Sequence, residues 1–441
     1  MATERKTLTQ LAVPICLETL FYMLSGMVDT LMLSSVSDQA VGAVGTANTY
    51  ISVFIIMFGV ISSGMVAVMS QNIGAGRPGI AYQARQLGLA FNAVLGVIMS
   101  LFLSLGAGTI LSGVGVADAL MQPAKTYLQI VGGFCILNAL IPICSSYLRA
   151  FGFSKEPLYA SIIGNVINFC LNAFFLFVLH KGVAGVATAT VISRIINLVI
   201  VVLLGAVLVK AKQHPERESN RAVMGQIIRI GLPSACETAI YNVSMTLVIR
   251  FLNQMDAQGL NVTARSYTMQ ITNFSYCVGA ALAQANAIMT GWHIGAKEYD
   301  ACDRGTKKAA VIGVIVAVIL ETVFTLCSGW IMQLFSKDPQ MVSLVGKLLA
   351  IDIVLEIGRV TNLVYGQALK TSGDAVFPVV MGACFMILCS VGGTYLFGIR
   401  LGLLAVGAYI GMTGDECVRA VGMYLRWKSG KWKEKGLVKS R

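Results

Sequence analysis

The stretch LAVPICLETLFYMLSGMVDTLMLSS, residues 11–35, decides the fold class because its apolar run is longer than a bilayer requires. A membrane-spanning helix needs about 20 mostly apolar residues. Two carboxylates, Glu18 and Asp29, interrupt this stretch eleven residues apart. Eleven residues are almost three helical turns, so both side chains fall on nearly one face, roughly 16 Å apart along the axis.

This acidic face needs a reason, because a carboxylate inside a membrane span costs about 2.5–3.5 kcal/mol on insertion scales. Neutral polar residues would hold helices together at a lower cost. We therefore interpret the face as the wall of a water-filled cavity, and we expect Asp29 to handle a cation.

The composition extends this reading to the whole chain. Of 441 residues, 56% are hydrophobic and only 12% are charged, whereas a soluble domain is about 25% charged. The apolar runs have helical length and lack the ~10-residue alternation of a transmembrane barrel. The sequence therefore predicts an all-α polytopic membrane protein.

Charge, cysteine and histidine usage exclude other classes of protein. The net charge of +12 arises from basic residues between apolar runs and in the tail 428–441, a distribution that sets topology and favours lipid headgroups over nucleic acid. The eleven cysteines form no CxxC pair, and the three histidines have no metal-ligand spacing. No Walker motif or catalytic cluster is present, so we expect neither an enzyme nor an organic cofactor.

Apolar segments of spanning length recur along the chain. Twelve can be drawn, at roughly 8–34, 40–70, 87–111, 120–149, 156–180, 184–210, 224–252, 258–290, 307–334, 341–370, 376–398 and 402–426. An even number places both termini on one side of the membrane. Lys and Arg are concentrated in the segments on that side, which predicts that both termini are cytoplasmic.

The two halves of the chain repeat each other at an offset of 219 to 221 residues. The matched segments are LAVPICLE at 11–18 with IGLPSACE at 230–237, SQNIGAGR at 70–77 with GWHIGAKE at 291–298, and YLRAFGFSKEP at 147–157 with ALKTSGDAVFP at 368–378. Both copies start on the same side, so this is a parallel repeat with a cleft between its halves as a natural ligand site.

The repeat also predicts the division of the chain. The expected parts are an N-terminal six-helix bundle at 1–210, a cytoplasmic linker at 211–222, a C-terminal six-helix bundle at 223–427 and a basic cytoplasmic tail at 428–441.

These features resemble the MATE family of multidrug and toxic compound exporters. The likeness lies in the VDT around Asp29, the IGAG and IGAK loops, NVINFCLN at 165–172 and LKTSGD at 369–374. The resemblance implies two six-helix bundles that form a V around a central cavity. It also implies export of organic, often cationic, compounds against an inward flow of H⁺ or Na⁺.

By the same resemblance, the coupling-cation site lies in the N-terminal half. Asp29 matches the first-span carboxylate, Asn168 and Asn172 match a fifth-span pair, and Thr190 matches a sixth-span hydroxyl. Some members have aspartate at the position of Asn172. One carboxylate with amides and a hydroxyl can accept a proton or bind Na⁺, so the coupling ion stays open between the two. We expect no metal ion other than Na⁺ at Asp29.

The C-terminal half departs from the family pattern in its tenth span, where Arg359 stands at the position of an acid. Its guanidinium needs an acidic partner, for which Glu237 and Glu356 are candidates. With Tyr241 and Arg265 they form a candidate C-lobe cavity, because aromatic faces attract organic cations. Buried charge pairs can equally be structural.

The leading hypothesis is a cation-coupled antiporter that exports amphipathic organic compounds by alternating access. We expect a monomer in the cytoplasmic (inner) membrane, whose partners are small organic substrates and the lipid bilayer. The alternatives are a flippase of lipid-linked precursors from the related superfamily and, from another class, a membrane scaffold without transport. A flippase favours more spans and a strongly basic cavity, and the two-fold repeat disfavours a scaffold.

Overall fold

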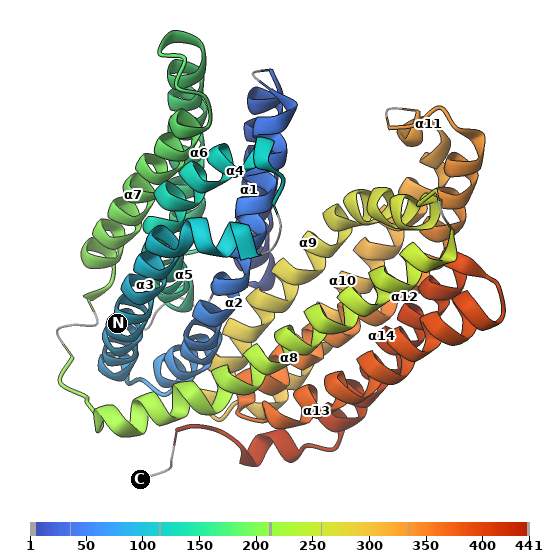
Figure 1. Cartoon of the computed structure of the whole chain (residues 1–441). Helices are drawn as coiled ribbons and strands as arrows, with labels where there is room; N and C mark the ends of the chain where they lie inside the picture. Colours follow the sequence, from blue (N-terminus) through green and yellow to red (C-terminus); the bar gives the residue numbers. More distant parts are fainter. Residues whose placement is uncertain are drawn as a thin grey trace. The chain divides into compact units, whose positions relative to one another are not determined.

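The computed structural model describes residues 6–35, 37–113, 116–210, 214–256, 258–333 and 335–438. These residues are almost entirely helical and contain no strand (Figure 1). Each of the twelve predicted spans corresponds to one helix or to a short run of helices. The predicted all-α membrane fold is thereby confirmed.

The chain divides into two compact units, which we call the N-terminal unit (Met1–Gly231) and the C-terminal unit (Leu232–Arg441). The N-terminal unit has a core that includes Leu103, Leu128 and Ala187. Its helices are α1 (Leu8–Ser34), α2 (Asp38–Gly74), α3 (Pro78–Gly113), α4 (Asp118–Tyr127), η1 (Leu128–Gly132), α5 (Ile136–Ala150), α6 (Lys155–Ala173), η2 (Phe174–Val178), α7 (Gly182–Leu208) and the start of α8 (Asn220–Met255).

The C-terminal unit has its own core, which includes Val248, Leu348 and Tyr409. After α8 its helices are α9 (Leu260–Gly295), α10 (Tyr299–Leu326), α11 (Ser328–Met332), α12 (Pro339–Ser372), α13 (Val376–Phe385), η4 (Met386–Val391), η5 (Thr394–Arg400), α14 (Leu404–Lys428) and η6 (Lys431–Glu434).

Apolar length differs between these helices. In the described residues, six are long and apolar enough to cross a membrane, and two bent pairs raise the number to eight. One pair, Asp118–Gly132 with Ile136–Ala150, bends by 43° where the π-helical η1 ends, and π-turns are a common cause of kinks. Polar and charged residues interrupt α8, α9, α12 and α14, which carry the C-terminal site described below.

The sequence repeat is visible in the backbone. Gly76 and Lys297 both have left-handed φ, 73° and 61°, in the matched IGAG and IGAK loops. Gly152 and Gly373, also matched, have φ of 88° and 98°. Such angles favour glycine, so the tight turns after the second, fourth, eighth and tenth spans have the same form in both halves.

The unit boundary lies inside α8, later than the predicted linker, of which 211–213 fall outside the described residues. The first turns of α8 pack on α2 within the N-terminal unit. A Cβ on Gly231 would lie 1.8 Å from the Val60 carbonyl oxygen, and one on Gly64 would lie 2.0 Å from that of Ile227. Only glycine permits this backbone contact, which ties the start of α8 to the first unit.

Candidate functional sites

The first candidate site joins α1 to α6 in the N-terminal unit. The Asn172 amide nitrogen donates to Asp29 Oδ1 at 2.7 Å and lies 3.2 Å from Asn168 Oδ1. Both asparagines are buried, and Asp29 is half-buried. The 3.6-residue period of a helix places Asn168 and Asn172 on one face of α6, so three of the four predicted residues form one hydrogen-bonded chain.

The oxygen atoms around this chain are only partly used. Asn172 Oδ1 is buried and has no hydrogen-bond partner within the described part of the protein. Thr190 on α7 is buried, but its hydroxyl donates to the Val186 carbonyl of its own helix at 2.9 Å. Arg194, one turn further along, is close enough to attract the charge of Asp29. Carboxylate, amide and hydroxyl oxygens suit a proton or a hard cation.

The second candidate site is a cavity of about 450 Å³ in the C-terminal unit. Four of the five predicted residues lie on its wall, namely Glu237, Tyr241, Arg265 and Arg359, whereas Glu356 does not. Sequence reasoning did not place four further charged residues on this wall: Asp352, Lys370, Glu416 and Arg419.

The acidic partner of Arg359 is Glu356 rather than Glu237. Arg359 contacts the buried Glu356 carboxylate one turn away on α12, and its Nε lies 3.9 Å from Glu416 on α14. Arg419 holds Glu416 at 2.8 Å and Asp415 at 2.8 Å. These pairs link α12 to α14 and neutralise most of the charge between the two helices.

Glu237 instead pairs with Lys370 of α12, at 2.5 Å. Its repeat counterpart Glu18 pairs with Arg149 of α5, also at 2.5 Å. Arg149 and Lys370 occupy the same position in YLRAFGFSKEP and ALKTSGDAVFP. Comparison of the repeats could therefore have identified both partners, and the duplicated pair ties the first span of each half to its fourth.

A family comparison now fits this geometry. The MatE family model matches residues 14–174 and, separately, residues 233–396. The chain belongs to the MatE family. The two matched segments begin at Pro14 and Pro233, which are counterparts in the sequence repeat. The resemblance predicted from the loops and the VDT segment is thereby confirmed.

Relatives of this MatE transporter cover nearly its full length. An uncharacterized transporter of Bacillus subtilis strain 168, YisQ, is 34% identical over 443 residues, which cover 99% of this chain and 97% of the relative. A probable multidrug resistance protein of Thermotoga maritima, NorM, is 23% identical over 98% of this chain and 94% of its own.

Solved structures share the fold. A MATE transporter in the straight conformation superposes with a TM-score of 0.88 at 19% identity, covering 97% of this chain and 96% of the other. A transporter of the MOP superfamily from Pyrococcus furiosus, described as having a binding pocket of reversed polarity, gives 0.86 at 18% identity over 98% and 96%. At this identity the likeness concerns the fold of this MatE transporter alone.

Proposed function

We propose that this MatE transporter exports small amphipathic organic compounds, often cationic, in exchange for H⁺ or Na⁺ by alternating access. The observation that supports it best is the buried chain from Asp29 through Asn172 to Asn168, which leaves Asn172 Oδ1 without a partner in the described part of the protein. A hydrogen-bonded carboxylate beside an unused amide oxygen provides a place for one small cation.

The coupling follows from the charge of Asp29. When Asp29 is ionised, it accepts the Asn172 amide and attracts Arg194. A bound proton removes that charge, and a bound Na⁺ would take ligands from Asp29, Asn168 and Asn172. Either event changes the contacts between α1 and α6. It therefore favours one conformational state, and substrate favours the other, as a difference in affinity between states requires.

The cavity of the C-terminal unit is the proposed substrate site of this chain. Tyr241 and Tyr276 present aromatic rings to it, beside the Glu237 carboxylate, and aromatic faces and acids attract organic cations. Its wall carries Arg265, Arg359, Lys370 and Arg419 against Glu237, Asp352 and Glu416, a near balance that disfavours a lipid pyrophosphate. We place the protein in the cytoplasmic membrane as a monomer with both termini cytoplasmic, on the distribution of Lys and Arg.

The test is transport of a cationic dye by purified protein in proteoliposomes, driven separately by a pH gradient and by a Na⁺ gradient. Asp29→Asn should reduce gradient-driven transport by about 100-fold, because the amide neither binds a proton in this pH range nor supplies a charge. Asp118→Asn, the same change at an exposed acid of the same unit, should transport normally. Undiminished transport by Asp29→Asn would contradict the proposal.

A further inference from the structure

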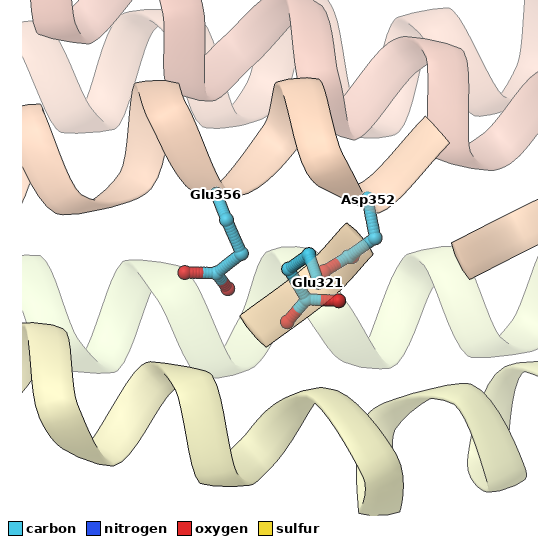
Figure 2. A group of neighbouring side chains, drawn as sticks. All are labelled: Glu321, Asp352 and Glu356. Carbon is cyan, nitrogen blue, oxygen red and sulfur yellow. The ribbon is translucent and has the colours of Figure 1, made fainter. Parts of the chain in front are cut away.

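A second group of carboxylates lies inside the C-terminal unit. Glu321 belongs to α10, and Asp352 and Glu356 lie one turn apart on α12; we call the three the acidic cluster. One oxygen of each lies within 4.8 Å of the others, and the side chains extend into the space between the two helices (Figure 2). All three residues are buried, with exposures of 0%, 2% and 0%.

The acidic cluster has too little positive charge. Glu356 contacts Arg359, but within the described ranges neither Glu321 nor Asp352 forms an ion pair. Both oxygens of Glu321, Asp352 Oδ2 and Glu356 Oε2 also lack hydrogen-bond partners among those residues. A buried charge without a partner costs several kcal/mol, so the cluster must hold cations or protons.

Ser275 of α9 gives an independent indication of a ligand. Its side chain is fully buried at 0% exposure and lies beside Glu321. Its hydroxyl nevertheless makes no hydrogen bond in the described part of the chain. A third helix therefore adds an unused oxygen to the carboxylate oxygens, and oxygen-only ligand sets select small hard cations over transition metals.

The spacing and access also suit an ion. Oxygens on opposite sides of a hard cation such as Ca²⁺ are about 4.6–5.2 Å apart, so one ion can contact all three carboxylates of the acidic cluster. Asp352 also lies on the wall of the 450 Å³ cavity, which gives an ion a route to the cluster.

The fold itself does not require acids at these positions. With the 221-residue offset fixed by the turns on both sides, the acidic cluster matches Ser100, Val131 and Cys135 in the N-terminal unit. Val131 and Cys135 belong to the apolar core there. The same helix packing is thus achieved without charge, and the three acids serve a purpose other than packing.

We propose that the acidic cluster, with the Ser275 hydroxyl, is a second cation site, specific for a small hard cation such as Na⁺ or Ca²⁺. It lies in the C-terminal unit and does not involve Asp29. It is therefore independent of the proposed coupling site, and either can fail without the other.

Equilibrium binding of ²²Na⁺ and ⁴⁵Ca²⁺ to the purified full-length protein at pH 8 tests this site, in an Asp29→Asn background that removes the N-terminal carboxylate. One of the two ions should bind, and the ion that does identifies the ligand. Glu321→Gln should weaken that binding at least tenfold. Glu434→Gln, the same change at an exposed acid of the same unit, should leave it unchanged. Equal binding by Glu321→Gln and Glu434→Gln would overturn the proposal.

Thermal unfolding of the same proteins separates cations from protons and detects misfolding. The bound cation should raise the Tm of the Asp29→Asn protein relative to choline, and Glu321→Gln and Asp352→Asn should abolish this rise while still eluting as folded protein. A Tm that depends on pH but on neither Na⁺ nor Ca²⁺ would show that the acidic cluster holds protons only, and would overturn the proposal.

Discussion

Glu18 contacts Arg149 in the N-terminal unit in the same way that Glu237 contacts Lys370 in the C-terminal unit. The glycine turns repeat as well. Charges outside these shared features belong to one unit only. Asp29 matches Val248, which is fully buried in the apolar core of the C-terminal unit, and the acidic cluster has no charged counterpart in the N-terminal unit.

The difference separates scaffold from chemistry. Residues that hold the helices of a unit together occur twice, because both units have the same helix arrangement. Residues that are expected to bind ligands occur once. In a duplicated protein, a buried charge without a counterpart in the other half is therefore a stronger indication of function than a buried charge that is repeated.

The largest effect on stability is expected where a charge has no counterpart. Arg359→Ala leaves Glu356 and Glu416 without their shared cation and should reduce the free energy of unfolding by about 3–5 kcal/mol. The matched change Asn138→Ala should cost less than about 1 kcal/mol, a typical value for one neutral hydrogen bond. Chemical unfolding in detergent measures both.

A double change provides the control for that prediction. Glu356→Gln combined with Arg359→Met removes the acid together with the base, and it should recover most of the stability lost in Arg359→Ala. Equal costs for Arg359→Ala and Asn138→Ala would contradict the distinction between repeated and unrepeated charges.

A smaller effect, similar in the two units, is expected for the duplicated ion pair. Arg149→Ala and Lys370→Ala should each reduce the free energy of unfolding by about 2 kcal/mol, because each leaves a partly buried carboxylate without its cation. Charge reversal of the second pair, Glu237→Lys with Lys370→Glu, should restore part of the loss. A large difference between the two alanine variants would show that the pairs are not equivalent.

The smallest effect concerns the starts of α2 and α9, which are capped by counterparts in the repeat. The Ser37 hydroxyl accepts the amide hydrogen of Gln39 at 3.1 Å, and the Asp256 carboxylate accepts those of Leu260 and Asn261 at 2.8 and 3.1 Å. Ser37→Ala and Asp256→Ala should each cost about 1 kcal/mol, as measured by the shift in unfolding midpoint.

Acid should make these two caps differ. Partial burial raises the pKa of Asp256, but hydrogen bonds from Asn261 and Leu260 outweigh it and hold the pKa below its ordinary value. The stabilisation is therefore present above about pH 4 and is lost as the pH falls through the lowered pKa. Ser37 does not titrate, so only the effect of Asp256→Ala should fade with acid. An effect of Asp256→Ala that is the same at pH 3 and pH 7 would contradict this.

The sequence predicts most of the fold, because the length of each apolar run sets the length of its helix. It misses the polar helix ends. The third span begins at Pro78 rather than near 87, and the ninth at Tyr299 rather than near 307. Backbone hydrogen bonding continues through polar residues once they lie outside the apolar layer, and hydrophobicity cannot register that continuation.

The sites are less accessible to such reasoning. The spacing of Asn168 and Asn172 predicts a shared helix face, but only the fold brings that face to Asp29 on another helix. Glu321 escapes attention as a lone acid in the run VIGVIVAVILETVF. Its neighbours come from α12 and α9, so its role depends on long-range contacts that local pattern does not encode.

The course of α8 has a consequence for engineering. Its first turns belong to the N-terminal unit, where Gly231 meets the backbone of Val60. A chimaera joined to a relative in the preceding loop would place a foreign helix end against α2 and lose the glycine contact. Exchange of halves between members of the family should therefore succeed when the junction follows Pro233, and a gene cut at the same point defines the natural modules for recombination.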